Sequence, residues 1–172
     1  MPVYAIGDRV PSIDPRAFVH PEAVIIGDVT VGAESSIWPG TVLRGDHGAI
    51  RVGARTSIQD GAIVHCTAEL DTVVGDDCTV GHLAHLEGCT LESGSLVGSG
   101  ATVLHRAVVR TGALVAAQAL VPPGTEVPPG ALARGVPARI VEGAADPELL
   151  AHATRTYVRN AHWYNAELRH ID

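Results

Sequence analysis

The chain has 172 residues and a formal net charge of -7, and it is 46% hydrophobic but only 3% aromatic. A single domain of this size can bury a substantial core, which here must be built from Val, Ile, Leu and Ala. The negative charge argues against nucleic acid or an anionic membrane surface as a partner. The chain has no leader-like start, no apolar run of about 20 residues and no paired cysteine spacing, so we expect a cytoplasmic protein with free thiols.

Aliphatic residues recur every six positions through most of the chain. They fall into sets of three, namely Val31, Ile37, Leu43; Val52, Ile58, Val64; Val74, Val80, Leu86; Leu91, Val97, Val103; and Val109, Val115, Val121. One hexad of this kind describes a short strand and a tight turn, and three hexads make one triangular coil of a parallel β-helix. A β-sandwich would instead show a period of two and longer turns. Residues 1–140 are therefore predicted to form a mainly β domain, a parallel β-helix of hexapeptide repeats.

The pattern changes after the stretch VPPGTEVPPG, whose prolines end the repeat. Residues 146–170 are predicted to form a C-terminal α-helix, with Asp146 as its N-cap and Pro147 at its first position. Leu149, Tyr157, Trp163 and Tyr164 lie on one predicted face of this helix. We expect that face to pack on the coils or on a neighbouring subunit.

The repeat also predicts which polar residues are neighbours on adjacent coils. Leu43, Val64 and Leu86 share one edge, and the residues that follow them are Arg44, His65 and Glu87. His65 and Glu87 are therefore expected one strand spacing apart, about 4.8 Å, where they can grip a divalent cation together. His82 falls on another edge of its coil, so it is expected to complete such a site only across a subunit boundary.

The runs SIWPGTVLRGDHGAIRVGARTSIQDGAIVHCT and DDCTVGHLAHLEGCT resemble the gamma-class carbonic anhydrases. The resemblance covers roughly residues 10–140. It implies a left-handed β-helix, a homotrimer with a divalent metal at each subunit interface, and hydration of a small-molecule substrate, CO₂, by metal-activated hydroxide. Zinc is the favoured metal, with iron or cobalt as alternatives.

The resemblance implies His65 and the neighbouring subunit's His82 as metal ligands. The third ligand of the family is a histidine, and the matching position here is Glu87. Two histidines and a glutamate form a known catalytic zinc shell, and the carboxylate shifts preference toward harder ions. Two alternatives stay open: His85 supplies the third nitrogen, or the protein holds no functional metal.

Further site residues follow from the same resemblance. It implies that Gln59 orients the attacking hydroxide, that Arg44 and Asp46 belong to the catalytic site, and that Arg44 and Asp60 form salt bridges across the trimer interface. Tyr157 resembles a family tyrosine that reaches the site from the C-terminal helix. A purely structural role for Arg44, Asp46 and Asp60, and a core position for Tyr157, are the alternatives.

The remaining histidines share no predicted column with this site and are expected to be surface residues: His20, His47, His105, His152, His162 and His170. Two other functions are also compatible with the sequence. One is a non-catalytic trimeric scaffold or small-molecule binder that lost the chemistry, because Glu87 replaces a histidine and a long proton-shuttle loop is missing. The other is a hexapeptide acyltransferase or thioesterase relative, although the insertions between coils are short for an acyltransferase.

Overall fold

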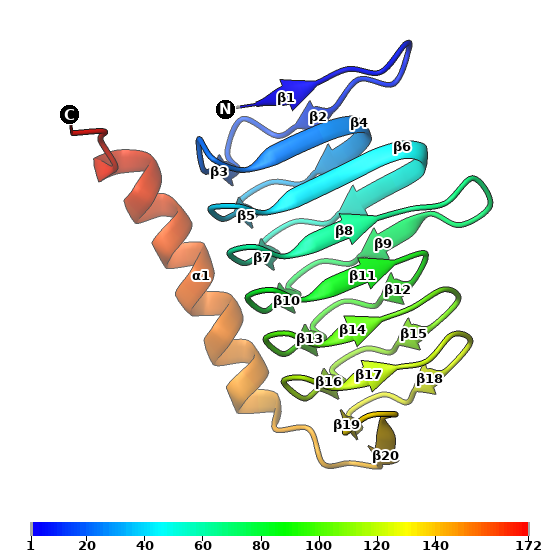
Figure 1. Cartoon of the computed structure of the whole chain (residues 1–172). Coiled ribbons are helices and arrows are strands. Elements are labelled where there is room, and N and C mark those ends of the chain that lie inside the picture. Colours follow the sequence, from blue (N-terminus) through cyan, green and yellow to red (C-terminus); the bar gives the residue numbers. More distant parts are fainter. Residues whose placement is uncertain (1, 172) are drawn as a thin grey trace.

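The computed structural model describes residues 2–171, which form a left-handed parallel β-helix with one α-helix along its side (Figure 1). Two sheets of twelve and eight strands wrap around the stack of coils. All strand pairs are parallel except β19 with β20. This antiparallel pair lies at the last coil, where the smaller sheet ends. The predicted fold class, including the C-terminal helix, is therefore confirmed.

Most strands are two or three residues long, as a six-residue repeat with a tight turn requires. The larger sheet contains β1 (Val3–Tyr4), β2 (Ser12–Ile13), β4 (Val24–Val31), β6 (Val42–Val52), β8 (Ile63–His65), β9 (Thr72–Val74), β11 (His85–Glu87), β12 (Thr90–Leu91), β14 (Thr102–Val103), β15 (Val108–Val109), β17 (Leu120–Val121) and β18 (Glu126–Val127). The smaller sheet contains β3 (Phe18–Val19), β5 (Ser36–Ile37), β7 (Ser57–Ile58), β10 (Thr79–Val80), β13 (Leu96–Val97), β16 (Leu114–Val115), β19 (Leu132–Arg134) and β20 (Arg139–Val141).

The aliphatic residues of the hexads form the core. Along the smaller sheet, Ile37 pairs with Ile58 and Ile58 with Val80, and each of these side chains is fully buried. Small residues such as Ala62 and Ala84 fill the remaining inward positions. One coil alone would leave its apolar edge in water, so the stability of each coil depends on its neighbours.

Strands β4 and β6 are longer because they continue around one corner of the coil. Gly27 and Gly45 are paired at this corner, and the backbone of Gly27 has a φ of +79°. A Cβ atom at Gly27 would lie 2.1 Å from the carbonyl oxygen of Gly45. Only glycine therefore allows the two coils to stack at this corner.

The helix α1 (Pro147–Glu167) begins as predicted, because the Asp146 carboxylate accepts hydrogen bonds from the first turn. It runs along β3, β5, β7 and β10 (Figure 1). Its predicted inner face is partly wrong: the side chains of Leu149 and Trp163 are 50% and 54% exposed. Leu150 and Ala161 are buried instead, and Tyr157 and Tyr164 pack in an aromatic cluster with Phe18 and Trp38. No described helix is long and apolar enough to cross a membrane.

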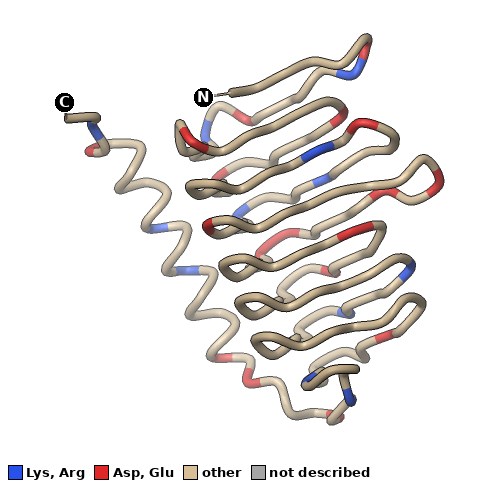
Figure 2. The backbone as a smooth tube through the Cα atoms, viewed as in Figure 1, with Lys and Arg blue, Asp and Glu red and all other residues tan. Residues whose placement is uncertain are grey.

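Charged residues lie along the outer edges of the coils, where both signs are interspersed (Figure 2). Several form ladders between coils: the Arg110 guanidinium lies 2.7 Å from the carboxylates of both Glu92 and Glu126. The three cysteines are free, as expected, and all three are buried.

Candidate metal centre

His65 and Glu87 are paired residues on the neighbouring strands β8 and β11. Val64 and Leu86, which precede them, are fully buried, so the next side chains along each strand point away from the core. His65 Nδ1 lies 2.8 Å from Glu87 Oε1. The hexad spacing thus brings the two predicted ligands into direct contact in one chain.

The second ring nitrogen of His65 also has a carboxylate partner. His65 Nε2 lies 3.0 Å from Asp46 Oδ1, and Arg44 forms a salt bridge with the same Asp46 carboxylate. Arg44 and His65 are paired on β6 and β8. Four predicted site residues therefore form one continuous chain of contacts, Arg44–Asp46–His65–Glu87, across three coils.

The two carboxylates of this chain are stabilised in their charged form. Partial burial alone would raise the pKa of Glu87, but the hydrogen bond with His65 and the nearby charge of that ring, together with the approach of His85 and His105, lower it. Burial would also raise the pKa of Asp46. The hydrogen bonds from His65 and Arg44 outweigh this effect, so the pKa of Asp46 is lowered. Both side chains are therefore anionic at neutral pH, the form that a cation needs.

His82 lies apart from these residues within one chain. It precedes β11, whereas Glu87 ends that strand. Its Nδ1 atom lies 2.8 Å from Asp60 Oδ2 on the adjacent coil, and its Nε2 atom has no partner among residues 2–171. A metal-binding histidine commonly has a carboxylate beside one ring nitrogen while the other nitrogen binds the metal, and the His82–Asp60 pair brings the same two groups together.

Gln59 and Tyr157 belong to the same edge as His82. Gln59 is only 4% exposed, and its side-chain amide has no hydrogen-bond partner in the described chain. Tyr157 of α1 packs against Trp38, with ring centroids 5.7 Å apart. Burial, and then the charge of Asp60, raise the pKa of Tyr157, which keeps its phenol protonated.

The donor set fits a divalent cation, although one chain alone does not assemble it. In residues 2–171, no group of three or more His, Cys, Asp or Glu side chains stands in an arrangement that would hold a metal. His65 and Glu87 supply one nitrogen and one oxygen at one corner of the coil, and His82 presents a nitrogen at another corner. Such a division suits a ligand shell completed by a second subunit.

His105 was expected to be a surface residue that shares no column with this site; its side chain is partly exposed, but it reaches Glu87. His105 Nε2 lies 3.9 Å from Glu87 Oε2, and His85 Nε2 lies 3.5 Å from the same oxygen. The paired positions Leu86 and Val103 could have revealed this, because two residues further along each strand stand Gly88 and His105. The Glu87 carboxylate is thus approached by three imidazoles of its own chain.

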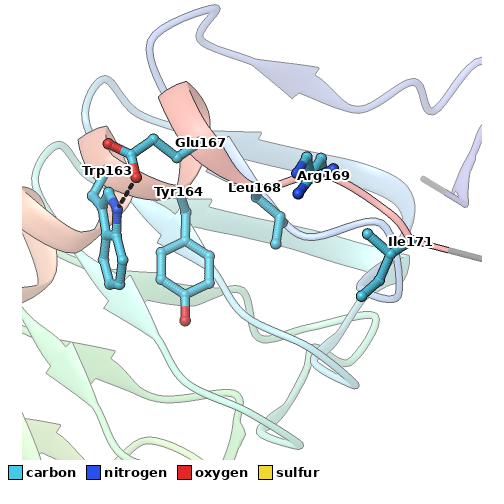
Figure 3. Close-up of a pocket in the computed structure, with 6 residues that line it drawn as sticks. All are labelled: Trp163, Tyr164, Glu167, Leu168, Arg169 and Ile171. Atoms are coloured by element: carbon cyan, nitrogen blue, oxygen red, sulfur yellow. Dashed lines mark hydrogen bonds between the residues drawn. The ribbon is translucent and has the colours of Figure 1, made fainter.

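A pocket of about 350 Å³ lies at the C-terminal end of α1, away from all predicted site residues. Its lining consists of Trp163, Tyr164, Glu167, Leu168, Arg169 and Ile171 (Figure 3). The Trp163 indole N–H donates a hydrogen bond of 2.7 Å to Glu167 in its wall. None of the predicted metal ligands lines this pocket, so the candidate metal centre is assigned to the coil residues.

Comparison with known proteins gives a consistent result, although no protein-family profile matches the chain. Carnitine operon protein CaiE of Escherichia coli K12 is 42% identical over 149 residues, which cover 87% of this chain and 76% of CaiE. Gamma carbonic anhydrase 1, mitochondrial, of Arabidopsis thaliana is 41% identical over 168 residues, covering 93% of this chain and 61% of the plant protein. The crystal structure of a hexapeptide transferase family protein from Anaplasma phagocytophilum superposes with a TM-score of 0.91 at 38% identity, covering 95% and 98% of the two chains. The chain therefore belongs to the gamma carbonic anhydrase family of hexapeptide-repeat proteins.

Proposed function

We propose that this protein is a metal-dependent hydratase that interconverts CO₂ and bicarbonate at sites between the subunits of a homotrimer. His65 and Glu87 of one subunit and His82 of the next hold the metal. Zinc is the favoured ion, because two histidines and a glutamate form a known catalytic zinc shell, and iron and cobalt are alternatives.

The observation that carries this proposal is the carboxylate contact of both histidines. Asp46 lies 3.0 Å from His65, and Asp60 lies 2.8 Å from His82. Carboxylates beside metal-binding imidazoles fix the ring orientation and raise the basicity of the coordinating nitrogen. A scaffold that had lost its metal would have no need to keep both contacts.

When bound, the cation supplies Lewis-acid activation of water near neutral pH. The other steps belong to the protein. Asp46, held by Arg44, keeps the His65 ring in place, and Asp60 does the same for His82. The Gln59 residue is only 4% exposed. No hydrogen bond within the described chain occupies its side-chain amide, so the amide can hydrogen-bond the attacking oxygen and set its direction toward CO₂.

Tyr157 is the remaining polar group at this edge. Because burial keeps its phenol protonated, it can donate a hydrogen bond to a bicarbonate oxygen or to an ordered water. The phenol also limits water entry, since it packs with Trp38 on the coil surface. In this proposal Tyr157 binds and orients, and it does not exchange a proton.

The decisive experiment combines two inactive variants. His65→Ala and His82→Ala proteins are each incubated with zinc and assayed for CO₂ hydration by stopped flow. They are then co-refolded in equal amounts in the presence of zinc and assayed again. Each variant alone is expected to be inactive. Random mixing of head-to-tail subunits should rebuild roughly one interface in four, and so restore roughly a quarter of the wild-type rate.

A mixture that stays inactive while wild-type protein is active would exclude the intersubunit site. Wild-type protein that binds zinc but gives no rate above buffer would exclude CO₂ as the substrate. In that case the activated water has another electrophile, such as a thioester. Wild-type protein that binds no metal at all would favour the non-catalytic scaffold.

A further inference from the structure

The two oxygens of the Glu87 carboxylate have different surroundings. Oε1 lies 2.8 Å from His65 Nδ1, which is hydrogen-bond distance. Oε2 faces two other imidazoles, with His85 Nε2 at 3.5 Å and His105 Nε2 at 3.9 Å. Both separations are longer than an ordinary N–H···O hydrogen bond.

The sequence places these side chains together through the coil register. His85 and Glu87 flank the buried Leu86 on β11, so they project from the same outer face. His105 follows β14, the strand paired with β11 on the next coil. A Cβ atom at Gly88 would lie 3.1 Å from Cδ2 of His105, so the glycine beside Glu87 leaves the space that this ring occupies.

The distances from Glu87 Oε2 to the two imidazole nitrogens are close to the ligand spacings of a metal shell. Ligands at about 2.0–2.1 Å from a tetrahedral zinc ion lie roughly 3.3–3.5 Å from one another. The 3.5 Å separation of His85 Nε2 and Glu87 Oε2 already matches, and the 3.9 Å separation to His105 is slightly wide. Two imidazole nitrogens and one carboxylate oxygen are also a ligand set that zinc accepts with an open fourth position.

We propose that His85, Glu87 and His105 form a divalent-cation site contained within a single chain. No such trio already stands in coordination geometry anywhere in residues 2–171, so the cation has to draw the His105 ring inward. The side chains of His85 and His105 are 37% and 35% exposed, and this movement therefore disrupts little packing. His65 orients the carboxylate from its other oxygen.

This site goes beyond the proposed hydratase centre and shares only Glu87 with it. It requires neither His82 nor a neighbouring subunit. Metal binding to the two sites can therefore be distinguished in a variant that lacks His82. The intersubunit centre loses a ligand, whereas the single-chain site keeps all of its ligands.

The test measures Zn²⁺ binding by chelator competition in the full-length His82→Ala variant and in the same variant carrying His85→Gln and His105→Gln. Stoichiometry is measured by metal analysis, and the visible absorption of bound Co²⁺ reports its coordination. We expect His82→Ala to bind one Zn²⁺ per chain. The two further substitutions should weaken that binding at least about 100-fold, since loss even of a supporting partner costs about 10–100-fold. His152→Gln, at an exposed position on α1, is the matched control and should have no effect.

Either of two results would overturn the single-chain site. One is complete loss of Zn²⁺ binding in His82→Ala alone; the other is unchanged binding after His85 and His105 are replaced. Thermal unfolding of each variant shows whether the fold is kept. If the glutamine variant misfolds, the same measurement is made with His85→Ala and His105→Ala in the His82→Ala background. Failure of CO₂ hydration in wild-type protein would affect only the hydratase proposal, because the present readout is binding.

Discussion

His65 Nδ1 and Glu87 Oε1 lie 2.8 Å apart on adjacent coils, although 22 positions separate the two residues in sequence. The contact follows from strand register, because Val64 pairs with Leu86 directly beneath them. The same register applies on the other edge, where Ile58 pairs with Val80 and the following Asp60 and His82 meet at 2.8 Å. Each histidine of the proposed centre is thus accompanied by a carboxylate from a neighbouring coil.

The identity of residue 87 should decide metal uptake. Glu87→Ala removes the oxygen donors of both proposed sites, so purified protein should lose its bound metal. Glu87→His restores the family's third imidazole and should retain a stoichiometric ion, with a stronger preference for zinc over manganese. Metal analysis after dialysis against a weak chelator measures both results. Equal metal content in wild type and Glu87→Ala would show that Glu87 is not a ligand.

Asp60 is expected to act through His82 rather than on the substrate. Asp60→Asn removes the charge that orients the His82 ring and should weaken Zn²⁺ affinity about 10–100-fold. A chelator-competition titration measures the change. Asp28→Asn is a matched control, because Asp28 pairs with Arg51 elsewhere on the coils. If both substitutions lower the affinity equally, the effect comes from net charge and not from the orientation of His82.

Much of the fold and part of the site could be predicted from the sequence, because a parallel stack converts spacing along the chain into contacts between coils. The aliphatic hexads predicted which side chains are buried, and their register predicted the His65–Glu87 contact. The Asp60–His82 contact follows from the same register, although the family resemblance implied an interface salt bridge for Asp60.

The features that escaped prediction lie where the six-residue period does not set side-chain direction. His105 follows β14 in a turn, and its approach to Glu87 depends on the space left by Gly88. The buried face of α1 depends on how far the helix is rotated about its axis. Consecutive helical residues point about 100° apart, so the rotation of the helix decides whether Leu149 or Leu150 faces the coils, and here it is Leu150.

Acid should reveal the contribution of Glu87 to folding stability. The lowered pKa of Glu87 means that the folded state holds this proton less tightly than the unfolded state, whose pKa is about 4.3. Its stabilising contribution is therefore present above pH about 4.3 and is lost as the pH falls through the lower folded pKa. Metal-free Glu87→Gln should be less stable than wild type at pH 7, and the difference should shrink toward pH 3.

Urea unfolding across this pH range measures that difference in free energy. Glu22→Gln, at an exposed turn position, serves as the control and should follow the wild-type curve. A difference between wild type and Glu87→Gln that stays constant with pH would contradict the assignment. The effect would then come from packing of the side chain and not from its charge.

The corner formed by Gly27 and Gly45 should tolerate no side chain. Gly27→Ala places a methyl group 2.1 Å from the Gly45 carbonyl oxygen, and it also strains a backbone with a φ of +79°. Gly112→Ala is a matched control, because Gly112 has a φ of +65° but nothing within 4 Å of an added Cβ. The control should lose about 1–2 kcal/mol of unfolding free energy from backbone strain alone. Gly27→Ala should lose at least about 2 kcal/mol more, because the coils must separate at the corner where β4 and β6 pair. Urea unfolding compares the free energies of unfolding of the two variants. Equal losses in Gly27→Ala and Gly112→Ala would show that close stacking at this corner does not require glycine.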